Sequence, residues 1–252
     1  MSKITKLILT AVFVLLAVPA LAQSKPAPIA EYWVFTLNNG ESAEFWKAFE
    51  EHIKVRKEAG DPWAWGVYTP LLGDQMGRVS VRYCCFEWAD VDAYRAWNEE
   101  NPDVAKHWSD NVAPHVAKTE HYFTEIGWNN SNWNDGDYKY FGVTNFKLKP
   151  SAVAVFDTAR DKMSQIALDN GWKGSWLWST RVGGSPMESV VVPYTSFAEM
   201  QRDGESFFGF LARVLGSEDI AADILADFTE PVWGQDYQVW EYHPQFSTQR
   251  DD

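Results

Sequence analysis

The sequence predicts an α+β protein built from two tandem copies of one β-α-β-β-α-β module. Strand-like and helix-like segments occur in the same order twice, and a polar stretch separates the two runs. The two copies also carry the same or similar residues at matching places, and the pairs are Tyr32 with Tyr140, Thr36 with Thr144, Gly60 with Gly171, Trp65 with Trp176, Trp88 with Tyr194, and Phe123 with Trp240. A repeated order of elements indicates a duplicated structural unit.

Residues 1–22 have the pattern of a secretory signal peptide, which we expect here. "MSKITK" is positively charged, "LILTAVFVLLAV" is apolar and "ALA" supplies small residues for cleavage. The apolar run is shorter than the roughly 20 residues that a membrane span needs. We therefore expect cleavage after Ala22, export to the periplasm or the extracellular space, no later membrane contact, and a flexible lead at residues 23–29.

The first module is predicted at residues 30–128. "EYWVFTLNN" is strand-like, and the following helix places Phe45, Phe49 and Ile53 on one side before Gly60 ends it. "WAWGVYT" and "GRVSVRYCCFEW" read as two strands. A helix in two pieces follows, and "EHYFTEIGW" forms the last strand.

The second module is predicted at residues 139–243, after a polar linker at 129–138. "YKYFGVTNFKL" is a strand, and "PSAVAVFDTARDKMSQIALDNG" is an amphipathic helix. "WLWSTR" and "MESVVVPY" form a hairpin around Gly183 and Gly184, because glycine supplies the backbone angles of a tight turn. Two helical pieces and the strand "DYQVWEYHP" complete the module, and residues 244–252 are a polar tail.

Tryptophan is unusually frequent, with 14 residues. Trp63 and Trp65 of the first copy, and Trp176 and Trp178 of the second, are expected on the second strand of their module. Residues two apart on a strand share one face, so each pair should lie side by side.

Cys84 and Cys85 are the only cysteines and are adjacent in a strand-like segment. Successive side chains of a regular strand point to opposite faces. Two buried, reduced thiols are therefore expected, with a vicinal disulfide as the alternative.

This element order resembles the dimeric α/β-barrel superfamily, which includes antibiotic biosynthesis monooxygenase-like and NIPSNAP-like proteins. The resemblance covers about residues 30 to 243 and rests on element order, module size and aromatic pattern. It implies two fused ferredoxin-like modules, whose four-stranded sheets pack face to face as one intramolecular barrel with helices outside. It also implies a small apolar or aromatic ligand between the two sheets, while dimerisation between chains stays open.

Nucleic acid is not expected as a partner, because the net charge of −13 repels phosphates. The chain contains none of the common nucleotide-binding, zinc-protease or serine-hydrolase motifs. The spacing of His107, His115 and His121 fits no compact metal site, so no metal is expected.

No cofactor is expected either. Some families of the superfamily, including chlorite dismutase-like proteins, bind haem through a helical histidine in the second module. Here that module has no histidine before His243. His52 or His107 of the first module would be the remaining haem ligands.

Polar and aromatic residues on the predicted strands supply the candidate site. His121 and Arg82 are the catalytic candidates, since either could stabilise a developing anion. Arg82 stands out because a buried guanidinium must be paired or presented to a ligand. The candidates for substrate binding are Trp65, Tyr68, Trp176, Trp178, Asn38 and Asn145.

Three functions are compatible with this pattern. The first is an exported protein that binds a small apolar or aromatic molecule. The second is a cofactor-independent monooxygenase-type enzyme. The third is a non-enzymatic structural or interaction protein whose aromatic residues fill the core.

Overall fold

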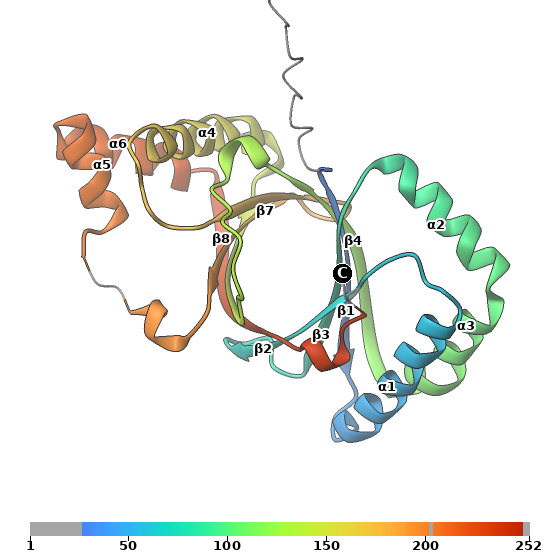
Figure 1. Cartoon of the computed structure of the whole chain (residues 1–252). Helices are drawn as coiled ribbons and strands as arrows, with labels where there is room; N and C mark the ends of the chain where they lie inside the picture. The colour runs from blue at the N-terminus through green and yellow to red at the C-terminus, as the bar shows by residue number, and fades with distance from the viewer. Residues whose placement is uncertain (1–26, 202–203, 249–252) are drawn as a thin grey trace, which may run out of the picture.

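The protein forms a closed eight-stranded barrel with helices outside it (Figure 1). The computed structural model describes residues 27–201 and 204–248. Strand order around the barrel is β1-β3-β2-β8-β5-β7-β6-β4, and all pairs are antiparallel. The predicted α+β class and the intramolecular barrel of two modules are confirmed. The predicted signal peptide at 1–22 lies outside the described residues, and no described helix is long and apolar enough to cross a membrane.

The first module follows the predicted order of elements. Its elements are β1 (Ile29–Leu37), α1 (Ser42–Glu58), β2 (Gly66–Leu72), β3 (Arg78–Phe86), α2 (Trp88–Glu100), α3 (Pro102–His107) and β4 (Val116–Ile126). A turn of π-helix at Trp108–Val112 and a short 3-10 turn at Ala113–His115 join α3 to β4.

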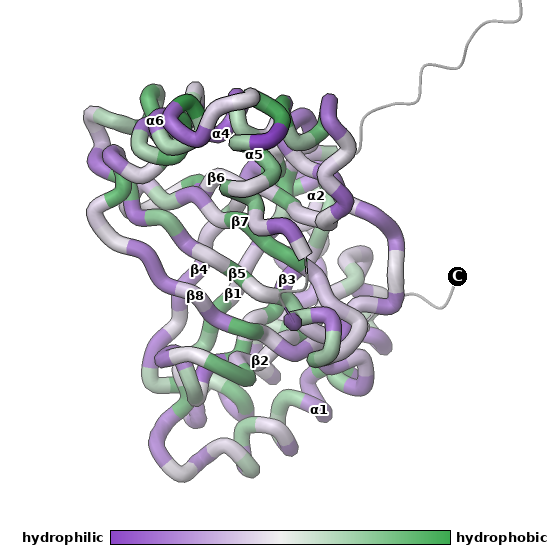
Figure 2. Tube along the Cα trace, turned by 90° about the vertical axis from the view of Figure 1, so that its left-hand side faces the viewer, coloured by the Kyte–Doolittle hydropathy of each residue, from purple (hydrophilic) through white to green (hydrophobic). Residues whose placement is uncertain are grey.

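The second module repeats the order. Its elements are β5 (Tyr140–Leu148), α4 (Val153–Asp169), β6 (Leu177–Val182), β7 (Met187–Tyr194), α5 (Phe207–Leu215), α6 (Glu218–Thr229) and β8 (Val232–Tyr242). In Figure 2 the barrel lies between the layer of α4, α5 and α6 and helix α1.

The two modules join through their edge strands. β2 pairs with β8, where Tyr68 lies opposite Tyr242, and β4 pairs with β6, where Thr124 lies opposite Arg181. The fourth strand of each module therefore pairs with the second strand of the other. Closure leaves no free strand edge between the modules, and an exposed edge is a site of aggregation.

Each strand has one face toward the barrel lumen and one face toward the helices. Residues directly opposite each other on paired strands share a face. Phe35 and Val67 point outward and pack with Phe45 and Phe49 of α1. Tyr32 is one residue from the outward Trp33 and therefore points into the lumen. This alternation separates the core under the helices from the lumen.

The repeat register differs from the predicted one in the first strand of each module. Leu37 and Leu148 occupy equivalent places, since each follows a register shift next to the last strand of its module. Val143, and not Tyr140, is then the counterpart of Tyr32. The same spacing of 111 residues matches Gly60 with Gly171 and Trp65 with Trp176, as predicted.

Cys84 and Cys85 are joined by a disulfide, so the expectation of two reduced thiols is wrong. The register of β1 with β3 shifts here, because Ile29 pairs with Phe86 and Ala30 with Cys84. Such a bulge interrupts the regular alternation on which the expectation depended. The peptide bond between the cysteines is cis, and their Cα atoms lie 3.0 Å apart.

Candidate functional site

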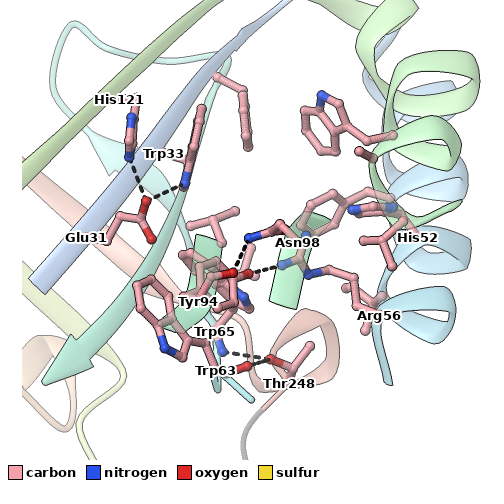
Figure 3. A pocket seen from close by; sticks show the side chains of 18 of the residues that line it. Glu31, Trp33, His52, Arg56, Trp63, Trp65, Tyr94, Asn98, His121 and Thr248 are labelled. Atoms are coloured by element: carbon pink, nitrogen blue, oxygen red, sulfur yellow. Dashed lines mark hydrogen bonds and ion pairs between the residues drawn. The ribbon is translucent and has the colours of Figure 1, made fainter. Parts of the chain in front are cut away.

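A cavity of about 560 Å³ lies in the first module, between the outer face of its sheet and the helices α1, α2 and α3 (Figure 3). It is therefore outside the barrel, whereas the sequence predicted a ligand between the two sheets. The sheet contributes Glu31, Trp33, Val81 and His121 to its wall. The opposite wall comes from the helices, and its residues include Phe49, His52, Arg56, Tyr94, Asn98 and Trp108.

The corresponding layer of the second module is packed mainly with apolar side chains, and it also holds the buried ion pair of Glu188 with Arg160. Phe146, Phe156, Trp178 and Phe228 form its core, and Phe156 and Phe228 have ring centroids 4.6 Å apart. Three ionisable residues of the first-module cavity have uncharged or apolar counterparts here, and the pairs are Glu31 with Gly142, His52 with Met163, and Arg56 with Ala167. One copy of the fold thus has a cavity with ionisable side chains in its largely aromatic wall, and the other copy has a packed core. The difference lies in these side chains and not in the topology.

Glu31, His121 and Trp33 form a connected group on the sheet side of the cavity. Nε2 of His121 lies 2.6 Å from Oε1 of Glu31, and the indole N–H of Trp33 donates to the same oxygen at 3.1 Å. The His121 ring stacks on Trp33 with centroids 3.8 Å apart. Register places the group, because Glu31 and Trp33 share a face of β1 and Trp33 lies opposite His121 on β4.

The burial of this pair is uneven. The Glu31 side chain is 7% exposed and that of His121 is 35% exposed. Oε2 of Glu31 is buried without a hydrogen-bond partner among the described residues. The Glu31 carboxylate accepts a hydrogen bond from the Nε2–H of His121, which leaves Nδ1 of His121 as a proton acceptor. The arrangement is therefore a carboxylate that fixes the tautomer of an accessible histidine.

A second polar group lies at the helix side of the cavity. Nε of Arg56 donates to Oδ2 of Asp61 at 2.6 Å, and Nη2 donates to the hydroxyl of Tyr94. The indole N–H of Trp65 donates to the same Asp61 oxygen at 3.2 Å. Burial is the main cause that raises the pKa of Tyr94 above its usual value, so its hydroxyl stays neutral. This network fixes the aromatic wall in place.

His52 is buried on α1 and lines the cavity beside His107 and Trp108. Burial, together with the nearby charges of Arg56 and His107, lowers the pKa of His52 to about 3. Its Nδ1 has no hydrogen-bond partner among the described residues. His52 is therefore neutral at physiological pH. Of the two histidines that could hold a haem in this module, only His52 lines the cavity.

Two of the predicted site residues line the cavity, namely His121 and Trp65. The prediction that Trp63 and Trp65 lie on the second strand is wrong, since both precede β2. The backbone of Trp65 bonds there to Thr248 of the C-terminal segment. The rings of Trp63 and Trp65 lie 5.7 Å apart, and Trp63 stacks on Tyr94 at 3.8 Å.

The other candidates lie elsewhere. Arg82, Tyr68 and Asn145 point into the barrel lumen, as the register of β3, β2 and β5 requires. Trp176 and Trp178 belong to the packed core of the second module. Asn38 follows β1 and bonds to Glu41 and to the backbone oxygen of Pro114, which is a structural role. The two catalytic candidates, His121 and Arg82, are thus on opposite faces of the sheet.

Sequence reasoning missed Glu31, Arg56 and Tyr94. Glu31 is the first residue of the predicted strand "EYWVFTLNN", where a charged residue is typical of a strand end, but the observed β1 begins two residues earlier at Ile29. Arg56 and Tyr94 lie on helices among other polar residues. The available signal was the repeat itself, since aligning the copies at a spacing of 111 pairs Arg56 with Ala167 and Glu31 with Gly142.

No protein-family profile and no curated protein sequence matches the chain. Solved structures with the same architecture do. An anthrone oxidase-like protein aligns with a TM-score of 0.52 at 13% identity, over 86% of this chain and 91% of that chain. A putative monooxygenase from Lactobacillus acidophilus NCFM aligns with a TM-score of 0.50 at 8% identity, over 86% of this chain and 94% of that chain.

A putative monooxygenase from Fusobacterium nucleatum subsp. nucleatum aligns with a TM-score of 0.51 at 11% identity, over 86% of this chain and 93% of that chain. At such identities the likeness concerns the fold. The chain shares the fold of these proteins, a closed α/β barrel, and carries both ferredoxin-like modules on one polypeptide.

Proposed function

We propose that this is an exported protein whose first-module cavity binds a small aromatic molecule that carries an acidic hydroxyl group. The hydroxyl proton passes to Nδ1 of His121, which Glu31 holds through Nε2. The observation that carries the proposal is the 2.6 Å contact between Glu31 and His121 at the wall of the aromatic cavity. The duplicated module has Gly142 and Tyr237 at the positions of Glu31 and His121.

The aromatic class follows from the cavity wall. Trp33, Trp63, Trp65, Tyr94 and Trp108 all line it, and they come from both the sheet side and the helix side. Flat apolar ligands gain from burial against such walls and from stacking on the rings. A few polar groups then fix the orientation of the ligand.

The hydroxyl group of the proposed ligand follows from the proton acceptor, Nδ1 of His121, that the Glu31–His121 pair presents. A histidine whose Nε2 is bound to a carboxylate can take a proton at Nδ1, and the carboxylate stabilises the imidazolium that forms. The ligand becomes an aryloxide beside a positively charged imidazole. An aromatic molecule without a hydroxyl gains only the apolar part of this binding energy.

Fluorescence titration with 1-naphthol and with naphthalene tests the proposal. We expect 1-naphthol to quench tryptophan emission saturably and to bind at least about tenfold more tightly than naphthalene. Glu31→Gln should remove that preference while apolar binding persists. Tyr237→Phe is the matched control, because Tyr237 occupies the place of His121 in the second module and the change should have no effect. Equal affinities of wild type for the two compounds would refute the proposed role of the hydroxyl.

A second candidate function is oxidation of the bound compound by O₂, and the proton-accepting pair favours it. Removal of the proton makes the ring electron-rich, so the substrate itself is the reductant. One O₂ would convert 1-naphthol to 1,4-naphthoquinone and water, and each product would receive one of the two oxygen atoms of O₂. Oxygen uptake that depends on His121 would establish this activity, whereas binding without oxygen uptake would leave the protein a binding protein. The anthrone oxidase-like protein and the putative monooxygenases share the fold.

Export is supported by the amino-acid sequence of residues 1–22 and by the disulfide of Cys84 and Cys85, since disulfides persist in oxidising compartments. Mass spectrometry of protein purified from the native host should find Gln23 at the N-terminus. Retention of Met1 would contradict export by signal cleavage.

A further inference from the structure

Arg82 points into the barrel lumen, the space enclosed by the eight strands. It lies opposite Tyr32 on β1 and opposite Gly66 on β2. Its Nε donates a hydrogen bond to the Tyr32 hydroxyl at 2.8 Å, and the guanidinium also bonds to Tyr68. The polar partners of this cation are therefore tyrosine hydroxyls.

These hydroxyls do not neutralise the charge. Burial, the largest cause, raises the pKa of Tyr68 to about 12, and burial likewise raises the pKa of Tyr122, which stacks on Tyr32. No carboxylate among the described residues forms an ion pair with Arg82. An arginine remains charged in proteins, and an unpaired charge away from bulk water is unfavourable.

The lumen carries an excess of positive charge in an otherwise acidic protein. Five cations and two carboxylates face it from paired strands, namely Arg78, Arg82, Arg181, Lys118, Lys147, Glu120 and Asp236. Oε1 of Glu120 lies 3.4 Å from Nη1 of Arg78, and Oε2 lies 3.7 Å from Nη2 of Arg181. This carboxylate therefore forms ion pairs with two other arginines. Asp236 accepts from Asn145 at 2.8 Å, and its Oδ2 lies 3.4 Å from Nζ of Lys147. Arg82 is the lumen cation that these acids leave uncompensated.

The lumen also has accessible space. Tyr32, Arg82, Tyr122, Val143 and Val191 point inward and are only half-buried. The interior of an eight-stranded barrel is just wide enough to be filled by side chains or to hold one small ligand. The lumen wall includes the apolar side chains of Val34, Val143, Leu177 and Val191 among polar ones.

We propose that the lumen binds a small carboxylate with a branched apolar body, whose carboxylate group contacts Arg82. The planar guanidinium matches a carboxylate in shape and offers several donors. The Tyr68 hydroxyl accepts from Arg82 and can donate its own proton to the anion. The valine and leucine side chains cover the apolar body. This site is on the opposite face of the sheet from the first-module cavity and does not depend on it.

Calorimetric titration of the full mature chain with pivalate, in chloride-free buffer, tests the proposal. Pivalamide has nearly the same shape without the charge and is the ligand control. We expect saturable pivalate binding, binding of pivalamide weaker by at least about tenfold, and a similar loss of pivalate affinity in Arg82→Gln. Arg82→Lys keeps the charge but loses the planar donor pair, so it should bind with intermediate affinity.

Tyr242→Phe is the matched control variant. The ring of Tyr242 lies 5.2 Å from that of Tyr68, but its hydroxyl is buried without a partner among the described residues, so pivalate affinity should be unchanged. Protein saturated with 1-naphthol should bind pivalate as before, which separates the two sites. Pivalate affinity equal in wild type and in both Arg82 variants would overturn the proposal. Absence of saturable binding to wild type, or equal affinity for pivalamide, would also overturn it.

Discussion

His52 should make the protein less stable in acid, and His52→Met should remove that effect. His52 is 3% exposed, and burial lowers its pKa from the ordinary 6.5 to about 3. The unfolded chain binds a proton at this residue below about pH 6.5, whereas the folded chain does not until about pH 3. The contribution of neutral His52 to the free energy of unfolding is therefore fully present above pH 6.5 and is lost as the pH falls toward 3. Methionine is the natural choice because Met163 is buried at the equivalent place.

The magnitude follows from the two pKa values. At about pH 5 the unfolded state gains roughly 2 kcal/mol from protonation of this one residue, and at about pH 4 roughly 3 kcal/mol. A whole domain is stable by about 5–15 kcal/mol, so the loss is measurable. His52→Met also replaces a ring nitrogen, Nδ1, that has no hydrogen-bond partner among the described residues.

Urea unfolding followed by tryptophan fluorescence at about pH 8 and about pH 5 measures the effect. The free energy of unfolding should fall by about 2 kcal/mol more in wild type than in His52→Met, since the other titrating groups change alike in both. Met163→Leu is the control, a core change without a titrating group, and should show the wild-type pH dependence. An equal fall in wild type and in His52→Met would refute the assignment of a neutral, buried His52.

Three further predictions concern stability. Arg56→Met should lower the free energy of unfolding in urea by about 3 kcal/mol, because it leaves the nearly buried Asp61 without its cation. The double variant Arg56→Met with Asp61→Asn should recover part of that loss. Burial, opposed by Arg160, raises the pKa of Glu188 to about 7. The unfolded chain releases this proton near pH 4.5 and the folded chain only near pH 7, so the free energy of unfolding should fall by up to about 3 kcal/mol as the pH rises between these values. Glu188→Gln should flatten that slope, and an unchanged slope would contradict the assignment. Residues 30–128 expressed alone should aggregate or self-associate in size-exclusion chromatography, because β2 and β4 lose their partners, and a folded monomer would contradict the dependence of each module on the other.

The fold was predictable because it depends on patterns that repeat along the chain. Helical spacing of apolar residues in α1, glycines after both first helices and the duplicated order of strands all predict the two modules. Their closure into a barrel came from the resemblance to a known superfamily. The C-terminal segment was predicted only as a polar tail, although Ser247 and Thr248 bond to the backbone near β2. Such pairing between distant segments leaves no periodic signal.

The candidate site was less predictable, because both faces of each sheet are largely apolar. His121 and Arg82 each stood out as polar residues on apolar strands, but the sequence could not place them on opposite faces. The register supplies that assignment: Trp33 lies opposite His121, and Tyr32 lies opposite Arg82. The cavity depends on the summed volumes of side chains from three helices and a sheet, so no single residue predicts it.

The central claim is that the first-module cavity binds an aromatic hydroxyl compound through His121 and Glu31. A crystal structure of the mature protein with 1-naphthol tests it most directly. We expect the naphthalene rings between Trp33 and the helices, with the hydroxyl oxygen within hydrogen-bonding distance of Nδ1 of His121. A cavity that contains only water at saturating 1-naphthol, or a ligand bound with its oxygen away from His121, would contradict the account.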